Sequence, residues 1–280
     1  MTQTSNPLRQ FFRQPAIYIK LPSNGQYWAP NTLEMPESGE LPVFPMTAID
    51  EITYRTPDAL YNGEAVISVI QSCVPNIKDA WAMPGVDIDT LLISIRIASY
   101  GHEMEVDTIC PNCTESQEIN LDLRKVMERL KAGDFTKPVV YNELEIHFKP
   151  LTYRQITKNN VRQFEEQKTI NILPDSTLSE EEKIAHLNKA IKNLTELTIQ
   201  TMAACINMVR TQGVLVTEYD YILEWLQNCD SVLFAKIRDH IASLREQTDM
   251  KPLELTCPAC QHQYLQPVSL DQSNFFGDAS

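Results

Sequence analysis

Two cysteine pairs with the same Cys-Pro-x-Cys spacing lie far apart in the chain, Cys110/Cys113 and Cys257/Cys260. Each pair stands between short segments in which apolar and polar residues alternate, so each predicts a β-hairpin with two thiols at its tip. Two such turns supply four thiolates, which is the ligand set of a closed tetrahedral zinc site. The spacing therefore predicts one structural zinc ion bound by these four cysteines.

The distance between the two pairs constrains the whole fold. A zinc–sulfur bond of about 2.3 Å requires the sulfur atoms to lie about 3.8 Å apart, so residues 114–256 must leave the site and return to it. We expect an α+β fold that is mainly helical, with a split four-cysteine zinc ribbon clamping a helical insertion. The expected order is an N-terminal arm at 1–16, an α/β region at 17–104, the ribbon at 105–123 plus 250–271, a helical insertion with a small hairpin at 124–249, and a C-terminal tail at 272–280.

Other uses of the cysteines are weaker alternatives. A thioredoxin-like redox pair needs a helix start after a βαβ pattern, and strands bracket both pairs here. Disulfides within the turns and other metals also remain alternatives. The seven cysteines are an odd number, and Cys73, Cys205 and Cys229 lie in apolar stretches typical of core thiols. Two histidines near the pairs, His102 and His262, are interpreted as surface groups or neighbours of the ligands.

Charge narrows the classes of partner. The 280 residues include 24 Lys and Arg against 37 Asp and Glu, a formal net charge of −13. Broad nucleic-acid binding needs clustered cations, yet the hairpin flanks at 105–122 and 252–271 contain no Lys or Arg. We see no secretory signal and no apolar run near the roughly 18 residues that span a bilayer. The expectation is a soluble protein of a reducing cytoplasm, with no nucleic-acid or membrane partner.

Periodicity and turn residues predict the remaining elements. An Asn-Gly turn at 24–25 predicts a hairpin between 16–21 and 26–28, and Thr47 is suited to cap a short helix. A further helical piece is expected to start at Thr56, and Asp87 or Asp89 to cap the next helix. A hairpin is expected at 139–148, followed by helices at roughly 153–171, 179–211, 217–228 and 231–247.

Apolar residues on the longest predicted helix recur with alternating spacings of three and four, which is typical of a coiled-coil seam. This seam consists of Ile184, Leu187, Ile191, Leu194, Thr198, Thr201, Cys205 and Met208. It either packs on neighbouring helices of the same chain or partly contacts another subunit. The arm at 1–16, which carries Arg9 and Arg13 and no acidic residue, is the second candidate contact surface.

No residue pattern predicts catalysis. The five histidines form no His-Glu-x-x-His motif, and no Gly-x-Ser-x-Gly, Gly-x-Gly-x-x-Gly or phosphate-binding glycine loop is present. Four thiolates leave no open coordination position, so a catalytic zinc is not expected. The chain suits an assembly component better than an enzyme.

Several segments, in this order, resemble the T4-like baseplate hub proteins of contractile-tailed bacteriophages. They are LPSNGQY at 21–27, LPVFPMTAIDE at 41–51, RTPDAL at 55–60, NGEA at 62–65, RIASYG at 96–101 and CPNC at 110–113. The resemblance implies a non-enzymatic virion protein of the tail baseplate, assembled in the host cytoplasm. It also implies a hetero-oligomer with other baseplate, tail-tube or hub subunits, in which the four cysteines hold a metal.

Two other classes stay open. A tail-assembly chaperone would help the hub form and then leave, so it would be absent from mature particles. A zinc-ribbon module that binds nucleic acid would need cations around the cysteine turns, and the flanks instead carry Glu105, Asp107, Glu115, Glu118 and Asp122.

Overall fold

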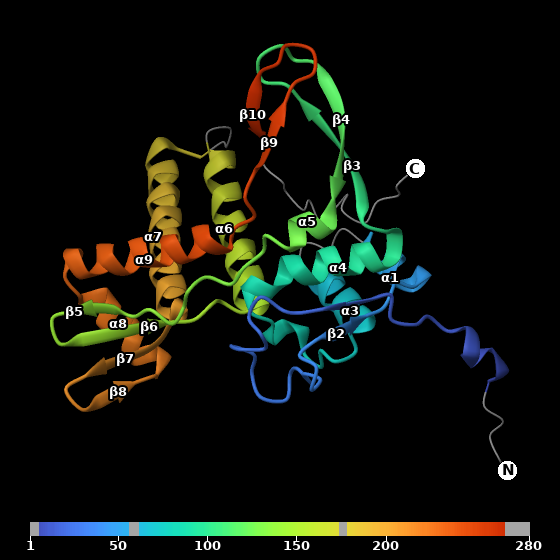
Figure 1. Cartoon of the computed structure of the whole chain (residues 1–280). Coiled ribbons are helices and arrows are strands. Elements are labelled where there is room, and N and C mark those ends of the chain that lie inside the picture. Colours follow the sequence, from blue (N-terminus) through green and yellow to red (C-terminus); the bar gives the residue numbers. More distant parts are fainter. Residues whose placement is uncertain (1–5, 56–61, 174–177, 267–280) are drawn as a thin grey trace. The chain divides into compact units, whose positions relative to one another are not determined.

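The computed structural model describes residues 6–55, 62–173 and 178–266 (Figure 1). Unit 1 comprises the described parts of Met1–Ala80, Asp87–Leu130 and Met250–Ser280, and unit 2 comprises those of Trp81–Val86 and Lys131–Asp249. The fold is α+β and mainly helical, with the four predicted cysteines brought together from distant segments, which confirms the predicted fold class.

Unit 1 begins with short helices and strands around a small core. Its first elements are η1 (Pro7–Phe11), β1 (Ile17–Ile19), β2 (Leu41–Val43), α1 (Ala48–Tyr54), α3 (Glu64–Cys73) and α4 (Ile88–Tyr100). The short helices η2 (Ala80–Ala82) and η3 (Gly85–Asp87) each include residues of both units. Thr47 caps α1 through a capping box with Asp50, as its position predicted. Both faces of α4 are apolar over most of its length, and Leu91, Ile93 and Ile95 are completely buried.

The hairpin predicted across the Asn-Gly turn is wrong. β1 pairs antiparallel with β2, from Ile17 opposite Val43 to Ile19 opposite Leu41. Asn24 and Gly25 do form a turn, with φ of 50° and 78°, but Tyr27 has φ 67°, a left-handed conformation that a strand residue does not adopt. The turn therefore redirects the chain and makes no hairpin.

Asp87 fixes this turn to the start of α4. Its carboxylate accepts hydrogen bonds from the Ser23 backbone N–H at 2.9 Å, the Ser23 hydroxyl at 2.5 Å and Trp28 Nε1 at 2.9 Å. Asp87 stands at the predicted N-cap position, yet its side chain makes no capping bond because it is turned toward Ser23. Burial raises the pKa of Asp87, and the bonds from Ser23 and Trp28 oppose that rise.

The N-terminal arm is anchored through Arg13. Its guanidinium donates to the Pro45 carbonyl at 2.5 Å and to both the carbonyl and the hydroxyl of Ser72 at 2.8 Å, and it pairs with Asp50 at 3.3 Å. Asp50 is 7% exposed, so this ion pair is mostly withdrawn from water. Leu8, Phe11 and Phe12, which precede the anchor, are exposed.

Unit 2 combines a four-stranded antiparallel sheet with four helices. The sheet order is β5 (Val139–Tyr141), β6 (Leu144–Phe148), β7 (Ile206–Thr211) and β8 (Val214–Val216), and the helices are α6 (Tyr153–Ile172), α7 (Glu180–Cys205), α8 (Tyr219–Asn228) and α9 (Ser231–Thr248). One face of the sheet packs on α8 and α9 around Phe148, Ile222 and Ile237. The segment Trp81–Val86 also joins unit 2, because Met83 and Gly85 hydrogen-bond with the backbone of residues 151–153.

The helix predicted over 179–211 extends too far. α7 ends at Cys205, and Ile206 is extended, with φ −84° and ψ 124°. In β7, buried Ile206 and Val209 face the core and pair with β6, so tertiary pairing outweighs the helical spacing that continues to Met208. The other three helices of this region and the hairpin at 139–148 are confirmed, with ends within two residues.

Some predictions fall on residues outside the described ranges. These are the helical piece starting at Thr56, the first five residues of the arm, the last residues of the ribbon at 267–271 and the tail at 272–280. Among the helices that are described, none combines the length and apolarity needed to cross a membrane.

Candidate metal centre

The first cysteine pair occupies the tip of a regular hairpin in unit 1. β3 (Glu103–Ile109) pairs antiparallel with β4 (Ser116–Asp122) without a register shift. At the tip, the Cys110 N–H donates to the Glu115 carbonyl and the Thr114 N–H donates to the Cys110 carbonyl, each at 2.9 Å. Thr114 has φ 59°, and this left-handed residue closes the turn.

The second pair repeats this geometry. β9 (Leu253–Thr256) pairs with β10 (Gln263–Gln266), and the Cys257 N–H donates to the His262 carbonyl at 2.9 Å. The Gln261 N–H donates to the Cys257 carbonyl at 2.9 Å, and Gln261 has φ 58°. Equal spacing thus produces the same turn twice, with Cys257 in the place of Cys110 and Gln261 in the place of Thr114.

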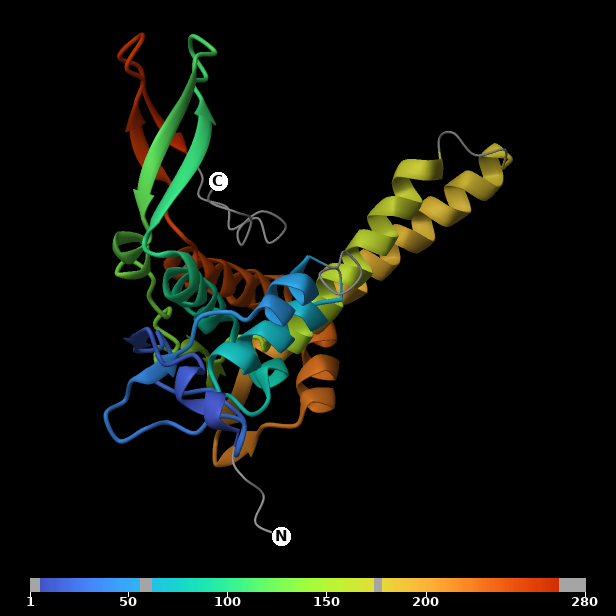
Figure 2. The same cartoon turned by 90° about the vertical axis from the view of Figure 1, so that its right-hand side faces the viewer.

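The two hairpins lie side by side with their turns adjacent, as both views show (Figures 1 and 2). The sulfur of Cys110 lies 3.7 Å from that of Cys260, and the sulfur of Cys113 lies 3.6 Å from that of Cys257. All four sulfur atoms lie within 4.8 Å of one another. Tetrahedral zinc thiolate sites place sulfur atoms about 3.8 Å apart, so the four cysteines could bind one metal ion.

The two turns protect the sulfurs unequally. Cys110 and Cys257, the first cysteine of each pair, are completely buried, whereas Cys113 and Cys260 are half-buried. Asn112 donates a side-chain hydrogen bond to the Cys260 sulfur at 3.6 Å. This bond, with the His262 backbone N–H, lowers the pKa of Cys260 to about 6.

The pKa of a thiol in the cluster indicates what a bound cation would contribute. The backbone N–H of Glu115 lowers the pKa of Cys113, but the three neighbouring sulfurs raise it, and the balance is a pKa of about 12. Four adjacent thiolates repel one another, so full ionisation needs a nearby positive charge. A divalent metal supplies that charge and keeps coordinating thiols deprotonated.

Side chains below the turns also join the two hairpins. The Tyr264 hydroxyl, from β10, lies 3.1 Å from the Thr108 hydroxyl of β3 and accepts a short hydrogen bond from the Gln117 amide of β4. Thr108 is buried. The hairpins therefore contact each other through a polar cluster in addition to the cysteines.

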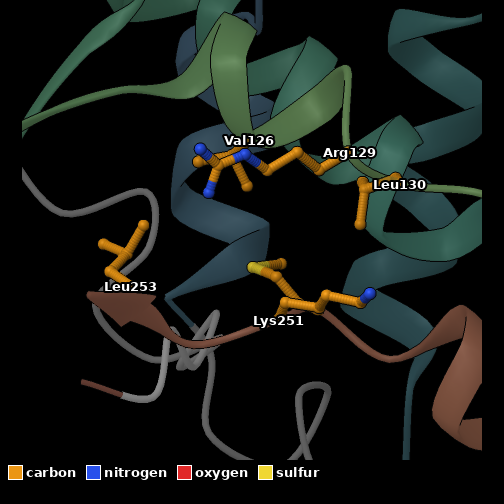
Figure 3. Close-up of a pocket in the computed structure, with 6 residues that line it drawn as sticks. Val126, Arg129, Leu130, Lys251 and Leu253 are labelled. Carbon is orange, nitrogen blue, oxygen red and sulfur yellow. The ribbon is translucent and has the colours of Figure 1, made fainter. Parts of the chain in front are cut away.

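The segments at the base of the hairpins also lie next to each other (Figure 3). α5 (Leu123–Met127) and the turn after it face the segment that leads into β9, across a hollow in unit 1. The hollow is lined by Val126, Arg129, Leu130, Met250, Lys251 and Leu253. It brings together the point where the chain leaves the first hairpin and the point where it enters the second.

The remaining candidate residues lie outside the cluster. In the described part of the chain, only the four cysteines form a group suited to a metal, so neither His102 nor His262 is among its members. Cys73 is buried, and Cys205 and Cys229 are half-buried. Burial raises the pKa of Cys73 and of Cys205 to about 12, which keeps these thiols protonated and unreactive.

This arrangement suits a structural role. Four sulfur donors complete a tetrahedral shell and leave no position for a reacting water or substrate. The exposed face of β3 and β4 carries carboxylates, including Glu105, Asp107 and Glu118, and no cation that would bind a phosphate backbone. The fold and the cluster define an α+β protein with a cysteine cluster divided between two distant hairpins.

Comparison with known families gives a more specific class. Residues 35–277 match the family model described as T4 bacteriophage base plate protein, and the chain belongs to this family. No curated protein and no solved structure matches the chain. The match covers both cysteine hairpins and all of unit 2.

Sequence reasoning found the four cysteines but missed the residues around them. Asn112, Thr108, Gln117 and Tyr264 carry no spacing signal, because their contacts join strands more than 140 positions apart. Asn112 stands inside the Cys-Pro-x-Cys turn, where a polar side chain points toward a sulfur or toward solvent. Its position was the one indication in the sequence of a contact with the cluster. The partners of Asp87 were also missed, because Ser23 and Trp28 precede it by about 60 residues.

Proposed function

We propose that this protein is a structural component of the hub region of a contractile-tail baseplate and acts in virion assembly through protein–protein contacts. The observation that carries the proposal is the match to the base plate family over residues 35–277. The narrower assignment to the hub rests on the ordered segments between 21 and 113 that resemble hub proteins. Its partners would be other baseplate, tail-tube or hub subunits.

We further propose that Cys110, Cys113, Cys257 and Cys260 bind one structural zinc ion. The sulfur separations of 3.6 and 3.7 Å support this, as does a donor set of four thiolates. The ribbon at 105–123 plus 250–271 would then hold the ends of the insertion at 124–249. Such a clamp gives a baseplate part the rigidity that defined contact surfaces require.

Composition of purified particles tests this role. We expect peptides of the protein in mature virions and in isolated baseplates, and we expect a phage lacking it to stop before baseplate completion. The measurement is quantitative mass spectrometry of virions, baseplates and tail precursors, with an abundant baseplate subunit as the internal standard. Peptides present in precursors but absent from virions would identify a departing chaperone and overturn the resident role.

A further inference from the structure

The N-terminal part of the apolar seam of α7 lies beside the helix face that packs on α6. α6 packs on the side of α7 that carries Ala190 and Leu197, both buried. Polar bonds hold the two helices together on this side: Asn193 donates to Glu166 at 2.7 Å, and Asn159 donates to the Thr201 hydroxyl at 2.9 Å. The contact between α6 and α7 thus includes Thr201 of the seam and leaves its N-terminal part exposed.

The uncovered part of the seam is an apolar stripe. Ile184 is 57% exposed, Leu187 37% and Ile191 50%. The same spacing continues to Leu194 and Thr198, so the stripe runs for about 21 Å along the helix. Figure 2 shows this part of the α6–α7 hairpin extending beyond α8 within unit 2. Exposed Ile and Leu at heptad spacing are typical of a helix that packs on another helix.

The free edge of the stripe is uncharged along its centre, and charges stand at its N-terminal end, where Glu181 and Lys183 flank Ile184. On its free edge lie Asn188 and Thr195, four residues after Ile184 and Ile191, and α6 covers the opposite edge. Charges at these edge positions normally select a partner of opposite sign. Asn188 and Thr195 carry no charge, so the centres of two identical stripes meet without repulsion, and a second copy of this chain is an acceptable partner.

The charges at the two ends of the hairpin favour an antiparallel arrangement. The far end begins with Glu180, Glu181 and Glu182, whereas residues 153–162 of α6 contain three cations and no acid. Arg162 donates to Gln200 at 3.0 Å, which places this basic segment beside residues 200–201 of α7. If a two-fold axis passes at Ile191, residue 181 of one copy lies opposite residue 201 of the other. The acidic end of each hairpin then meets the basic segment of its partner. The two α7 helices also run in opposite directions, so their dipoles are antiparallel and attract each other.

We propose that the stripe Ile184, Leu187, Ile191, Leu194 and Thr198 is an interface with a second copy of this chain. Two α6–α7 hairpins associate antiparallel into a four-helix bundle with Ile191 at the two-fold axis. The contact is isologous: Ile184 of one copy meets Thr198 of the other, Ile191 meets Ile191, and Leu187 and Leu194 meet Thr195 and Asn188 of the free edge. This inference depends on neither the metal site nor the hub assignment.

The position of Ile191 on the axis allows a sharp test. In the metal-loaded full chain, Ile191→Glu and Ile191→Lys each place two like charges opposite each other, so each should raise the dissociation constant of the dimer about 100-fold or more. An equimolar mixture of the two variants should recover a heterodimer, because opposite charges then face each other. Val232→Glu, at a residue 55% exposed on α9, is the matched control and should leave the dimer unchanged.

Sedimentation equilibrium over a range of concentrations measures these states, and circular dichroism checks that helix content is unchanged. A wild-type dimer, monomeric Ile191 variants and a recovered heterodimer support the proposal. A monomeric wild type, or an Ile191→Glu variant as dimeric as the wild type, overturns it. Failure of the mixed variants to pair overturns the two-fold arrangement.

Discussion

Replacing Cys257 with serine should release the metal and loosen both cysteine hairpins. Cys257 is completely buried, and its sulfur lies 3.6 Å from that of Cys113, 144 positions earlier in the sequence. Structural zinc contributes about 10–16 kcal/mol of apparent folding free energy in small peptides, and losing one thiolate removes much of it. Isolated two-stranded hairpins are marginal in water, so neither hairpin should stay ordered without the metal.

Metal analysis, thermal unfolding and amide hydrogen exchange of Cys257→Ser measure this effect. The informative readout is exchange in β3 and β4, which should lose protection although the substitution lies in the other hairpin. Cys229→Ser is the matched control, because Cys229 is half-buried in unit 2 and outside the cluster. A Cys257→Ser protein that retains its metal and the protection of β3 and β4 would contradict the clamp.

Replacing Asp87 with alanine should cause the second large loss of stability. Three donors, the Ser23 N–H, the Ser23 hydroxyl and Trp28 Nε1, would lose a completely buried acceptor, and the two donors of Ser23 are themselves buried. A buried donor left unpaired costs about 1–3 kcal/mol, so the two donors of Ser23 alone should lower the free energy of unfolding by about 2 kcal/mol or more.

A graded series separates this cause from a general effect of substitution. Trp28→Phe removes one of the three bonds and should cost clearly less than Asp87→Ala. Asp220→Ala is the control, since Asp220 is also near a helix start but is exposed, and surface changes stay within about 0.5 kcal/mol. The measurement is the thermal unfolding midpoint of each variant. Equal midpoints for Asp87→Ala and Asp220→Ala would refute the role of this carboxylate.

The cysteine cluster was predictable because its signal is local and repeated. A Cys-Pro-x-Cys turn between alternating strands specifies the same geometry at Cys110 and at Cys257, and the tetrahedral shell then requires the two turns to meet. The capped helix starts at Thr47, Thr152 and Ser179 are local in the same way, since each cap acts within three residues.

The errors arose where distant contacts decide local structure. The helical spacing of α7 continues to Met208, but pairing with β6 turns residues after Cys205 into a strand. The Asn-Gly turn predicts a hairpin when only its neighbours are considered, yet Ser23 is held by Asp87 and the pairing partner of β1 is β2. No periodicity within either segment encodes these partners.

The exposure of the seam residues on α7 could not be predicted from the sequence either. The heptad spacing predicted an apolar seam but left open whether it packs within the chain. Only the side of α7 that α6 contacts, marked by Ala190 and Leu197, shows that Ile184 and Ile191 remain exposed. The seam is thus divided between a helix start that is free and a C-terminal part that packs in unit 2.

Metal content and sulfur coordination of the purified wild-type protein test the central claim most directly. The account predicts one zinc ion per chain, with X-ray absorption showing four sulfur neighbours at about 2.3 Å. A folded protein that contains no metal and keeps the hairpins of Cys110 and Cys257 protected from exchange would contradict it.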